Sequence, residues 1–255
     1  MFFDTHAHFD CFADAAEVRT VVERAAAAGV TRILAVGGSD ALNRAALTAA
    51  ETFPGRVFAA VGYDRDQADA SPSVSELDRL LDRPGVVAVG EMGLDYYYQP
   101  DNAPAQCALF EAQLDLARQR GLPVLIHSRE ADADTIRLLS AGPAPKGVLH
   151  CFTGTAEFAA RLLELGLWIS FSGILTFRNA DPLRAVAQTV PADRLLIETD
   201  TPFLAPVPHR GKRNEPAWVV HVAETLAKIR NDTVERIAHS TTANAERLFL
   251  GGRAS

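Results

Sequence analysis

Two patterns of apolar positions alternate along the chain: short runs rich in Val, Ile, Leu and Phe, and longer segments with apolar residues at helical spacing. The short runs predict eight buried strands, at Phe2–Thr5, Arg32–Val36, Val57–Val61, Val86–Val89, Pro123–Ile126, Gly147–Leu149, Trp168–Phe171 and Leu195–Ile197. The longer segments predict helices at Ala16–Ala28, Asp40–Thr52, Val74–Leu81, Gln106–Arg120, Ala131–Leu139, Ala156–Leu165, Pro182–Thr189, Ala217–Arg230 and Thr233–Phe249. Gly29, Gly121 and Gly166 each follow a helical segment, where a glycine commonly caps the helix.

Eight strands that alternate with helices over 255 residues predict an α/β protein with a TIM (β/α)₈ barrel. No Pro/Ser-rich linker, low-complexity block or internal repeat divides the chain, so we expect a single domain over residues 1–255. An open, doubly wound parallel sheet is the alternative, because periodicity alone does not distinguish the two arrangements.

The composition is that of a folded protein, with 48% hydrophobic and 22% charged residues. Three cysteines with no Cys-x-x-Cys pair argue against a disulfide framework and favour the cytoplasm. No targeting segment is visible at the start, and the charge-free apolar stretch Leu165–Phe177 is shorter than the roughly 20 residues of a membrane span. A net charge of −7 gives no overall attraction to nucleic acid, although bound cations or a basic loop can dominate locally.

Polar side chains with nitrogen and oxygen donors follow five of the predicted strands. In a barrel, catalytic groups come from the C-terminal ends of the strands, so these side chains would meet at one end. They are His6 and His8 after the first strand, Glu91 after the fourth, His127 after the fifth, His150 after the sixth and Asp200 after the eighth.

Each of these six residues also has an ordinary structural interpretation. A histidine at a strand end can pack in the core, and a carboxylate there can cap a helix or stay solvated. Burying four imidazoles and two carboxylates together without a cation would be costly, however. The donors suit Zn, Mn or Mg, and six of them exceed one tetrahedral site, so we expect two divalent metal ions that share a carboxylate.

Several motifs resemble those of TatD-type metal-dependent deoxyribonucleases, in the amidohydrolase-like superfamily. The resemblance extends over essentially the whole chain. It lies in Asp4-Thr5-His6-Ala7-His8-Phe9-Asp10, in Gly90–Tyr97, in Pro123–Arg129, in His150-Cys151-Phe152-Thr153-Gly154 and in Leu195–Pro216, which holds Glu198-Thr199-Asp200-Thr201-Pro202 and Arg210-Gly211-Lys212-Arg213-Asn214.

The resemblance implies a TIM barrel with a dinuclear metal centre and a 3′-to-5′ exonuclease activity on single-stranded DNA or RNA. By position, His6, His8 and Asp200 would bind one metal, and His127 and His150 the second. Glu91 would bridge the two, and Asp200 is the candidate to orient the attacking water and take its proton. Asp4 would either hold one imidazole in the required tautomer or make a structural hydrogen bond.

Four basic residues near these motifs are candidates for substrate contact: Arg129, Arg210, Lys212 and Arg213. The last three follow the eighth strand, where barrels often bind phosphate, and a solvated loop is the alternative. Arg129 could instead pair with Glu130 or Asp132.

Two neighbouring features have open interpretations. The Tyr96-Tyr97-Tyr98 run could stack on nucleobases or pack under a loop. Cys151 is expected to pack in the core and not to act as a nucleophile.

One segment departs from the family pattern. TatD-type nucleases usually carry a His-Pro-His-like turn after the third strand, and here the chain reads Gly62-Tyr63-Asp64-Arg65-Asp66. Two acids beside Arg65 would disfavour a polyanion. A hydrolase of carboxylic or aminoacyl esters (such as D-aminoacyl-tRNA), amides or lactones is therefore an alternative, and a catalytically idle scaffold is a third, although none of the six donors is missing.

Overall fold

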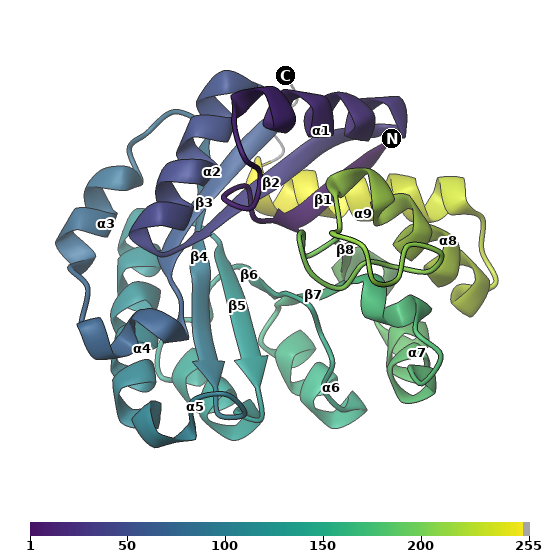
Figure 1. The fold of residues 1–255 in the computed structure, drawn as a ribbon. Coiled ribbons are helices and arrows are strands. Elements are labelled where there is room, and N and C mark those ends of the chain that lie inside the picture. The colour runs from purple at the N-terminus through teal and green to yellow at the C-terminus, as the bar shows by residue number, and fades with distance from the viewer. Residues whose placement is uncertain (252–255) are drawn as a thin grey trace.

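The eight apolar runs form one parallel sheet whose strands follow sequence order (Figure 1). The computed structural model describes residues 1–251, so the last four residues of the predicted single domain lie outside the described residues. The strands are β1 (Phe2–Ala7), β2 (Val30–Gly38), β3 (Val57–Tyr63), β4 (Val86–Asp95), β5 (Val124–Arg129), β6 (Gly147–Leu149), β7 (Trp168–Phe171) and β8 (Leu195–Ile197).

Helices follow the strands in alternation and surround the sheet (Figure 1). They are α1 (Ala15–Ala27), α2 (Asp40–Thr52), α3 (Val74–Leu80), α4 (Ala103–Arg120), α5 (Asp132–Ser140), α6 (Ala156–Glu164), α7 (Asp181–Thr189), α8 (Val219–Arg230) and α9 (Val234–Phe249). Gly29, Gly121 and Gly166 all have positive φ after their helices, as the cap pattern predicted. Within residues 1–251, no helix is long and apolar enough to cross a membrane.

The sheet closes on itself, which confirms the barrel and excludes the doubly wound alternative. Ala7 and Thr201 form a parallel bridge, the Asp200 N–H donates to the His6 carbonyl at 2.9 Å, and the His8 N–H donates to the Thr201 carbonyl at 2.8 Å. A strand order without reversal and a contact between the first and last strands define a (β/α)₈ barrel. This closure also brings Asp200 beside the two histidines that follow β1.

Buried apolar side chains form two layers of core. The larger layer lies between the strands and the helices, and the smaller one fills the barrel interior with residues such as Phe3, Leu125 and Trp168. Leu248 and Phe249 of α9 belong to the inner cluster. Because α9 packs at the barrel's N-terminal end, the polar chemistry is confined to the opposite end.

Amide side chains from the helices hold the C-terminal ends of β3 and β4. Asn43 on α2 exchanges two 3.0 Å hydrogen bonds with the Gly62 backbone, and Gln113 on α4 exchanges two 2.8 Å bonds with the Tyr63 backbone. Gln106 on α4 does the same for Asp95 at 2.8 and 3.2 Å. These three buried amides replace ladder hydrogen bonds where the strands diverge, and they fix the loops that reach the site.

The first prediction concerns Gln113. Gln113→Leu should lower the free energy of unfolding by about 2–6 kcal/mol, because two buried backbone groups of Tyr63 lose their partners at about 1–3 kcal/mol each. Urea unfolding followed by circular dichroism measures this. The control is Gln119→Leu on the exposed face of the same helix, expected within about 0.5 kcal/mol of wild type. Equal stability of the two variants would show that the amide bonds do not hold β3.

Candidate metal centre

The six donor residues predicted from the sequence meet at the C-terminal end of the barrel. We call them the donor cluster: His6, His8, Glu91, His127, His150 and Asp200. His6, Glu91 and His150 are 0–5% exposed, and His8 is 8% exposed. The strands continue further than the apolar pattern predicted, since β4 runs to Asp95 and β5 to Arg129. Glu91 and His127 therefore project from rigid strand backbone and not from loops.

Close backbone approach between β4 and β5 places two of the donors. A Cβ on Gly93 would lie 2.0 Å from the His127 carbonyl oxygen, so only glycine permits β4 to pack this closely against β5. The register pairs Gly93 with His127, and Glu91, two residues earlier on β4, reaches the His127 imidazole with its Oε1.

Glu91 contacts two pairs of imidazoles through its two separate oxygens. Its Oε2 lies 3.4 Å from His6 Nε2 and 3.7 Å from His8 Nε2. Its Oε1 lies 3.4 Å from His127 Nδ1 and 3.3 Å from His150 Nε2. This is the placement that a carboxylate bridging two cations requires.

The donor spacings fit metal coordination. The nitrogens of His6 and His8 lie 3.3 Å apart, as do those of His127 and His150. A tetrahedron with metal–ligand bonds of about 2.0–2.1 Å has edges of about 3.3–3.4 Å, so both groups could surround an ion. Asp200 Oδ1, at 3.8 Å from His6 Nε2, completes a group with His6 and His8.

Three imidazoles receive a partner on the nitrogen that faces away from the cluster. His8 Nδ1 lies 3.1 Å from the Val36 carbonyl, His127 Nε2 lies 3.0 Å from Asp95 Oδ2, and His150 Nδ1 lies 3.3 Å from Glu198 Oε1. Such partners fix the tautomer of a metal-binding histidine and increase its basicity. His6 Nδ1 is buried without a partner.

Burial and mutual charge shift the pKa values of the imidazoles in the donor cluster in different directions. Burial lowers the pKa of His6 to about 4 and also lowers the pKa of His127, which keeps both in the neutral form that binds metals. Burial opposes the charged form of His150, but the carboxylates of Glu91 and Glu198 outweigh it and raise its pKa well above the ordinary value.

The carboxylates are affected in opposite directions. Burial opposes the charged form of Glu91, but the surrounding imidazoles outweigh it and lower its pKa well below the ordinary value. Burial raises the pKa of Asp200 well above its usual range, and the neighbouring carboxylates add to the shift. Divalent cations at these donors would supply the positive charge that ionises Asp200, so the residues fit a metal centre.

Arg65 lies at the site, although the sequence pattern does not predict this position. It starts the 3₁₀ helix η1 (Arg65–Ala70), and its Nη1 lies 3.3 Å from Glu91 Oε1. Asp66 accepts a 2.8 Å hydrogen bond from Gln99, while Asp64 caps η1 through the Asp66 N–H. Burial and the nearby Glu91 raise the pKa of Asp64 to about 7. Of the three charged residues in this turn, the cation Arg65 is the one that contacts a donor residue, and its Nε also lies 3.6 Å from Asp66 Oδ1.

Asp4 makes a structural hydrogen bond and does not orient an imidazole. Its carboxylate accepts from the Thr199 N–H at 2.8 Å and from the Thr199 hydroxyl at 2.7 Å. Burial raises its pKa to about 8, with the Thr199 bonds opposing this shift. Asp4 therefore joins β1 to the segment after β8. The carboxylates that face an outer imidazole nitrogen are instead Asp95, beside His127, and Glu198, beside His150.

The four predicted substrate-binding residues differ in what surrounds them. Arg213 pairs with Glu17 and donates to the Cys11 carbonyl at 3.1 Å, so its charge is used within the fold. The Arg210 guanidinium lies 3.7 Å from the Phe177 ring centroid and lines a surface pocket, and Lys212 is exposed. Arg129 pairs with neither Glu130 nor Asp132 in the described chain and lies over the rings of two tyrosines.

Tyr96 and Cys151 are held by specific contacts. The Tyr96 hydroxyl donates to Asp134 at 2.8 Å, which favours packing over base stacking for this ring. Burial raises the pKa of the Cys151 thiol well above the ordinary value, and its Sγ lies 3.2 Å from the Ser172 hydroxyl. A thiol that resists ionisation is a poor nucleophile, as expected for this cysteine.

A parallel barrel with histidines and carboxylates gathered at its C-terminal end defines the class of metal-dependent hydrolase barrels. Residues 3–250 match the family described as TatD related DNase, and the chain belongs to this family.

Relatives and solved structures agree with this assignment. The chain is 41% identical to the uncharacterized metal-dependent hydrolase YabD of Bacillus subtilis, over 98% of this chain and 99% of YabD. It is 40% identical to the 3′-5′ ssDNA/RNA exonuclease TatD of Edwardsiella piscicida, over 91% and 93% of the two chains. The crystal structure of YjjV, a TatD homologue from Escherichia coli, superposes with a TM-score of 0.91 at 30% identity, covering 98% of each chain. The protein is a TatD-type metal-dependent hydrolase.

The second prediction concerns the partner of His127. Metal-free wild type should bind two equivalents of Mn²⁺ or Zn²⁺, and Asp95→Asn should weaken one of them by about 10- to 100-fold, because the imidazole loses its charged partner. Isothermal titration calorimetry measures both equivalents. Asp101→Asn, an exposed change in the following loop, is the control and should leave both affinities unaltered. A single equivalent in wild type, or an unchanged isotherm for Asp95→Asn, would contradict the assignment.

Proposed function

We propose that this protein is a metal-dependent nuclease that hydrolyses phosphodiester bonds of single-stranded DNA or RNA, with 3′-to-5′ exonuclease polarity. The observation that supports this proposal is that the two carboxylate oxygens of Glu91 each face a different pair of imidazoles. The relative named as a 3′-5′ ssDNA/RNA exonuclease agrees with it.

The proposed chemistry assigns a role to each part of the donor cluster. His6, His8 and Asp200 would hold one divalent cation, His127 and His150 a second, and Glu91 would bridge them. Zn, Mg and Mn all suit these donors. Bound cations polarise a phosphoryl oxygen and bring the pKa of water into a useful range.

Asp200 is proposed to orient the attacking water and accept its proton. The closure of the barrel holds its backbone, because the Asp200 N–H donates to the His6 carbonyl. Its φ of 60° is uncommon for a residue with a side chain, and this backbone turns the carboxylate toward His6 and His8. A fixed base near the attacking oxygen is worth about 10²- to 10⁴-fold in rate.

Arg65 favours an anionic substrate over a neutral ester, amide or lactone. Its Nη1 reaches Glu91 of the donor cluster, while its buried Nε makes no hydrogen bond and lies 3.6 Å from Asp66 Oδ1. A guanidinium held beside the donor cluster, with N–H groups beyond those facing the two carboxylates, suits a phosphoryl oxygen. Arg65 thereby places one positive charge at the site of a chain whose net charge is −7. We further propose a cytoplasmic location, on the basis of the three free cysteines.

The third prediction tests the nuclease activity. Wild type loaded with Mn²⁺, Mg²⁺ or Zn²⁺ should shorten a 5′-labelled single-stranded oligonucleotide stepwise, and a chelator should stop the reaction. Asp200→Asn should lower kcat at least about 100-fold through loss of the base. The control is Asp193→Asn, an exposed change at the opposite end of β8. Intact oligonucleotides, together with chelator-sensitive cleavage of aminoacyl or simple esters, would favour the ester hydrolase, and no hydrolysis of any substrate would favour the scaffold.

The fourth prediction concerns Arg65. Arg65→Met should lower kcat/KM for oligonucleotides by about 10- to 100-fold, the effect of losing one charged hydrogen bond. Arg65→Lys should recover part of this loss because the charge is kept. Arg79→Met, an exposed arginine on α3, is the matched control. If Arg65→Met cleaved a neutral p-nitrophenyl ester and the oligonucleotide with equally reduced efficiency, Arg65 would act through Glu91 and not on a phosphate.

A further inference from the structure

Large apolar side chains that remain exposed gather around the mouth of the barrel. Five are exposed among residues 1–251, and four of these lie on loops at the end that holds the donor cluster. They are Tyr97 at 52%, Tyr98 at 63%, Phe203 at 60% and Val207 at 49% exposed. Exposed aromatic rings concentrated beside one site indicate a binding surface.

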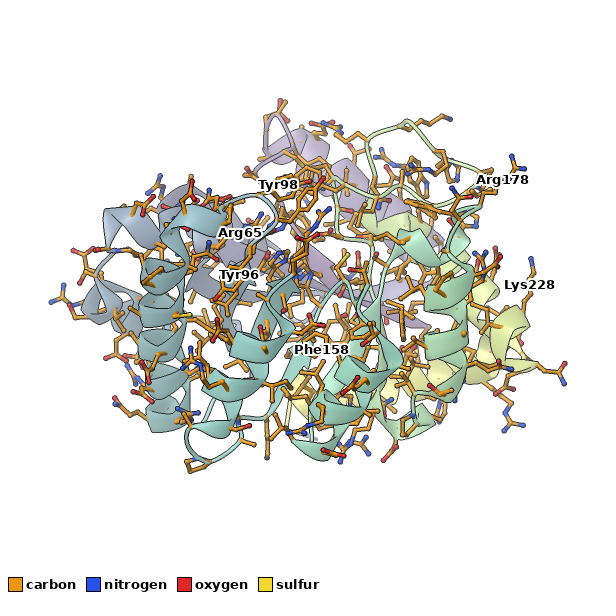
Figure 2. All side chains as sticks on the ribbon, turned by 90° about the horizontal axis from the view of Figure 1, so that it is seen from below. Arg65, Tyr96, Tyr98, Phe158, Arg178 and Lys228 are labelled. Atoms are coloured by element: carbon orange, nitrogen blue, oxygen red, sulfur yellow. The ribbon has the colours of Figure 1, made fainter. Side chains whose placement is uncertain are left out.

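Tyr97, Tyr98 and Arg129 form the first of two aromatic surfaces, which we call platform A. The two rings meet edge to face, with centroids 4.8 Å apart and an interplanar angle of 86°. The Arg129 guanidinium lies 4.1 Å from one ring centroid and 4.7 Å from the other. It makes no ion pair with a carboxylate within the described residues, so its charge is available to a ligand. Figure 2 shows Tyr98 on the same face of the molecule as Arg65.

Platform A is joined to the donor cluster by one carboxylate. Asp95 Oδ1 accepts from the N–H groups of Tyr97 and Tyr98 at 3.0 and 2.9 Å, while its Oδ2 lies 3.0 Å from His127 Nε2. Arg129 lies two residues after His127 on β5 and therefore projects to the same side. Asp95 therefore positions the backbone of platform A and also faces His127, a candidate metal ligand.

Phe203 forms the second surface, platform B, beside the other half of the cluster. Its ring centroid lies 6.5 Å from that of His8, at an angle of 72°. Its backbone is held at both ends, since the Phe203 N–H donates to the Asp200 carbonyl at 2.8 Å and its carbonyl accepts from Asn214 at 2.7 Å. The ring is exposed, but its position next to the site is fixed.

We propose that the two platforms bind the nucleobases on either side of the scissile phosphate, so that the substrate must be unpaired at both nucleotides. The inference rests on the proposed nuclease function and assigns its positioning residues. A base can stack on an exposed ring or on a guanidinium plane, and an arginine among aromatics also suits the phosphate backbone. The two surfaces adjoin His127 and His8, which belong to opposite halves of the donor cluster. A strand whose phosphate lies at the cluster would therefore present one base to each platform.

The test uses single-stranded hexanucleotides in which one flanking nucleotide is abasic. For wild type, removal of either base should lower kcat/KM by about 5- to 100-fold, the range expected when one stacking contact is lost. In Tyr97→Ala/Tyr98→Ala, removal of the base should no longer lower kcat/KM at one of the two positions, and the other position should behave as in wild type. In Phe203→Ala the two positions should exchange these roles. The conservative variants Tyr97→Phe/Tyr98→Phe and Phe203→Tyr should restore the wild-type dependence on both bases. Val207→Ala, on the same loop as Phe203, is the matched control and should behave as wild type.

A binding measurement separates the two proposals. The affinity of Asp200→Asn for the same oligonucleotides is measured by fluorescence anisotropy, with and without the platform substitutions. Removal of a base should weaken binding with the same dependence on its position, in the absence of turnover. Cleavage by wild type that is indifferent to base removal overturns the platforms and leaves the nuclease standing. Base-dependent binding without cleavage by wild type overturns the nuclease and leaves the platforms standing. Loss of base discrimination at both positions in each platform variant would also overturn the inference.

Discussion

The two oxygens of Glu91 connect the two halves of the site, and the rest of the structure depends on keeping them there. One carboxylate, 4% exposed, lies between four imidazole nitrogens at 3.3–3.7 Å. Burying this charge is unfavourable unless cations or protonated imidazoles surround it, and neutral imidazoles are the form that metals bind. The barrel supplies the required rigidity, because four strands of one closed sheet provide these side chains. His6 and His8 come from the end of β1, Glu91 from β4, His127 from β5 and His150 from the end of β6.

The loops that surround this carboxylate are held by side chains where the pairing of β3 with β4 ends, in addition to the strand pairing that continues on their other sides. Buried amides on α2 and α4 satisfy the backbone at the ends of β3 and β4, where neighbouring strands separate. Asp95 then serves two functions at once, since one oxygen faces His127 and the other receives the backbone of the tyrosine turn. A disturbance in α4 would therefore reach both His127, a candidate metal ligand, and the surface that we assign to the substrate.

The apolar pattern was sufficient to predict the order of the strands and the barrel, because buried parallel strands are apolar along their whole length. It ended β4 at Val89, whereas the strand continues to Asp95, since polar residues at a strand's functional end carry no periodic signal. The six donors could be found because strand ends converge in a barrel. The contacts of Arg65 with Glu91 and of Asp95 with His127 could not, nor could that of Glu198, itself at a strand end, with His150. Each contact depends on a side-chain direction across 26 to 48 positions of sequence.

Arg65 shows that the turn after β3 can lack the histidines of the family pattern and still place a cationic side chain at the site. An acidic turn in place of histidines predicts repulsion of polyanions, but the Arg65 guanidinium lies against Glu91, and Asp66, which faces its Nε, also accepts a hydrogen bond from Gln99. Local charge placement outweighs net charge at short range, because screening removes the field of distant exposed groups within about 10 Å. A chain with a net charge of −7 can therefore present a cationic site to a phosphate, provided that the cations are held where the substrate binds.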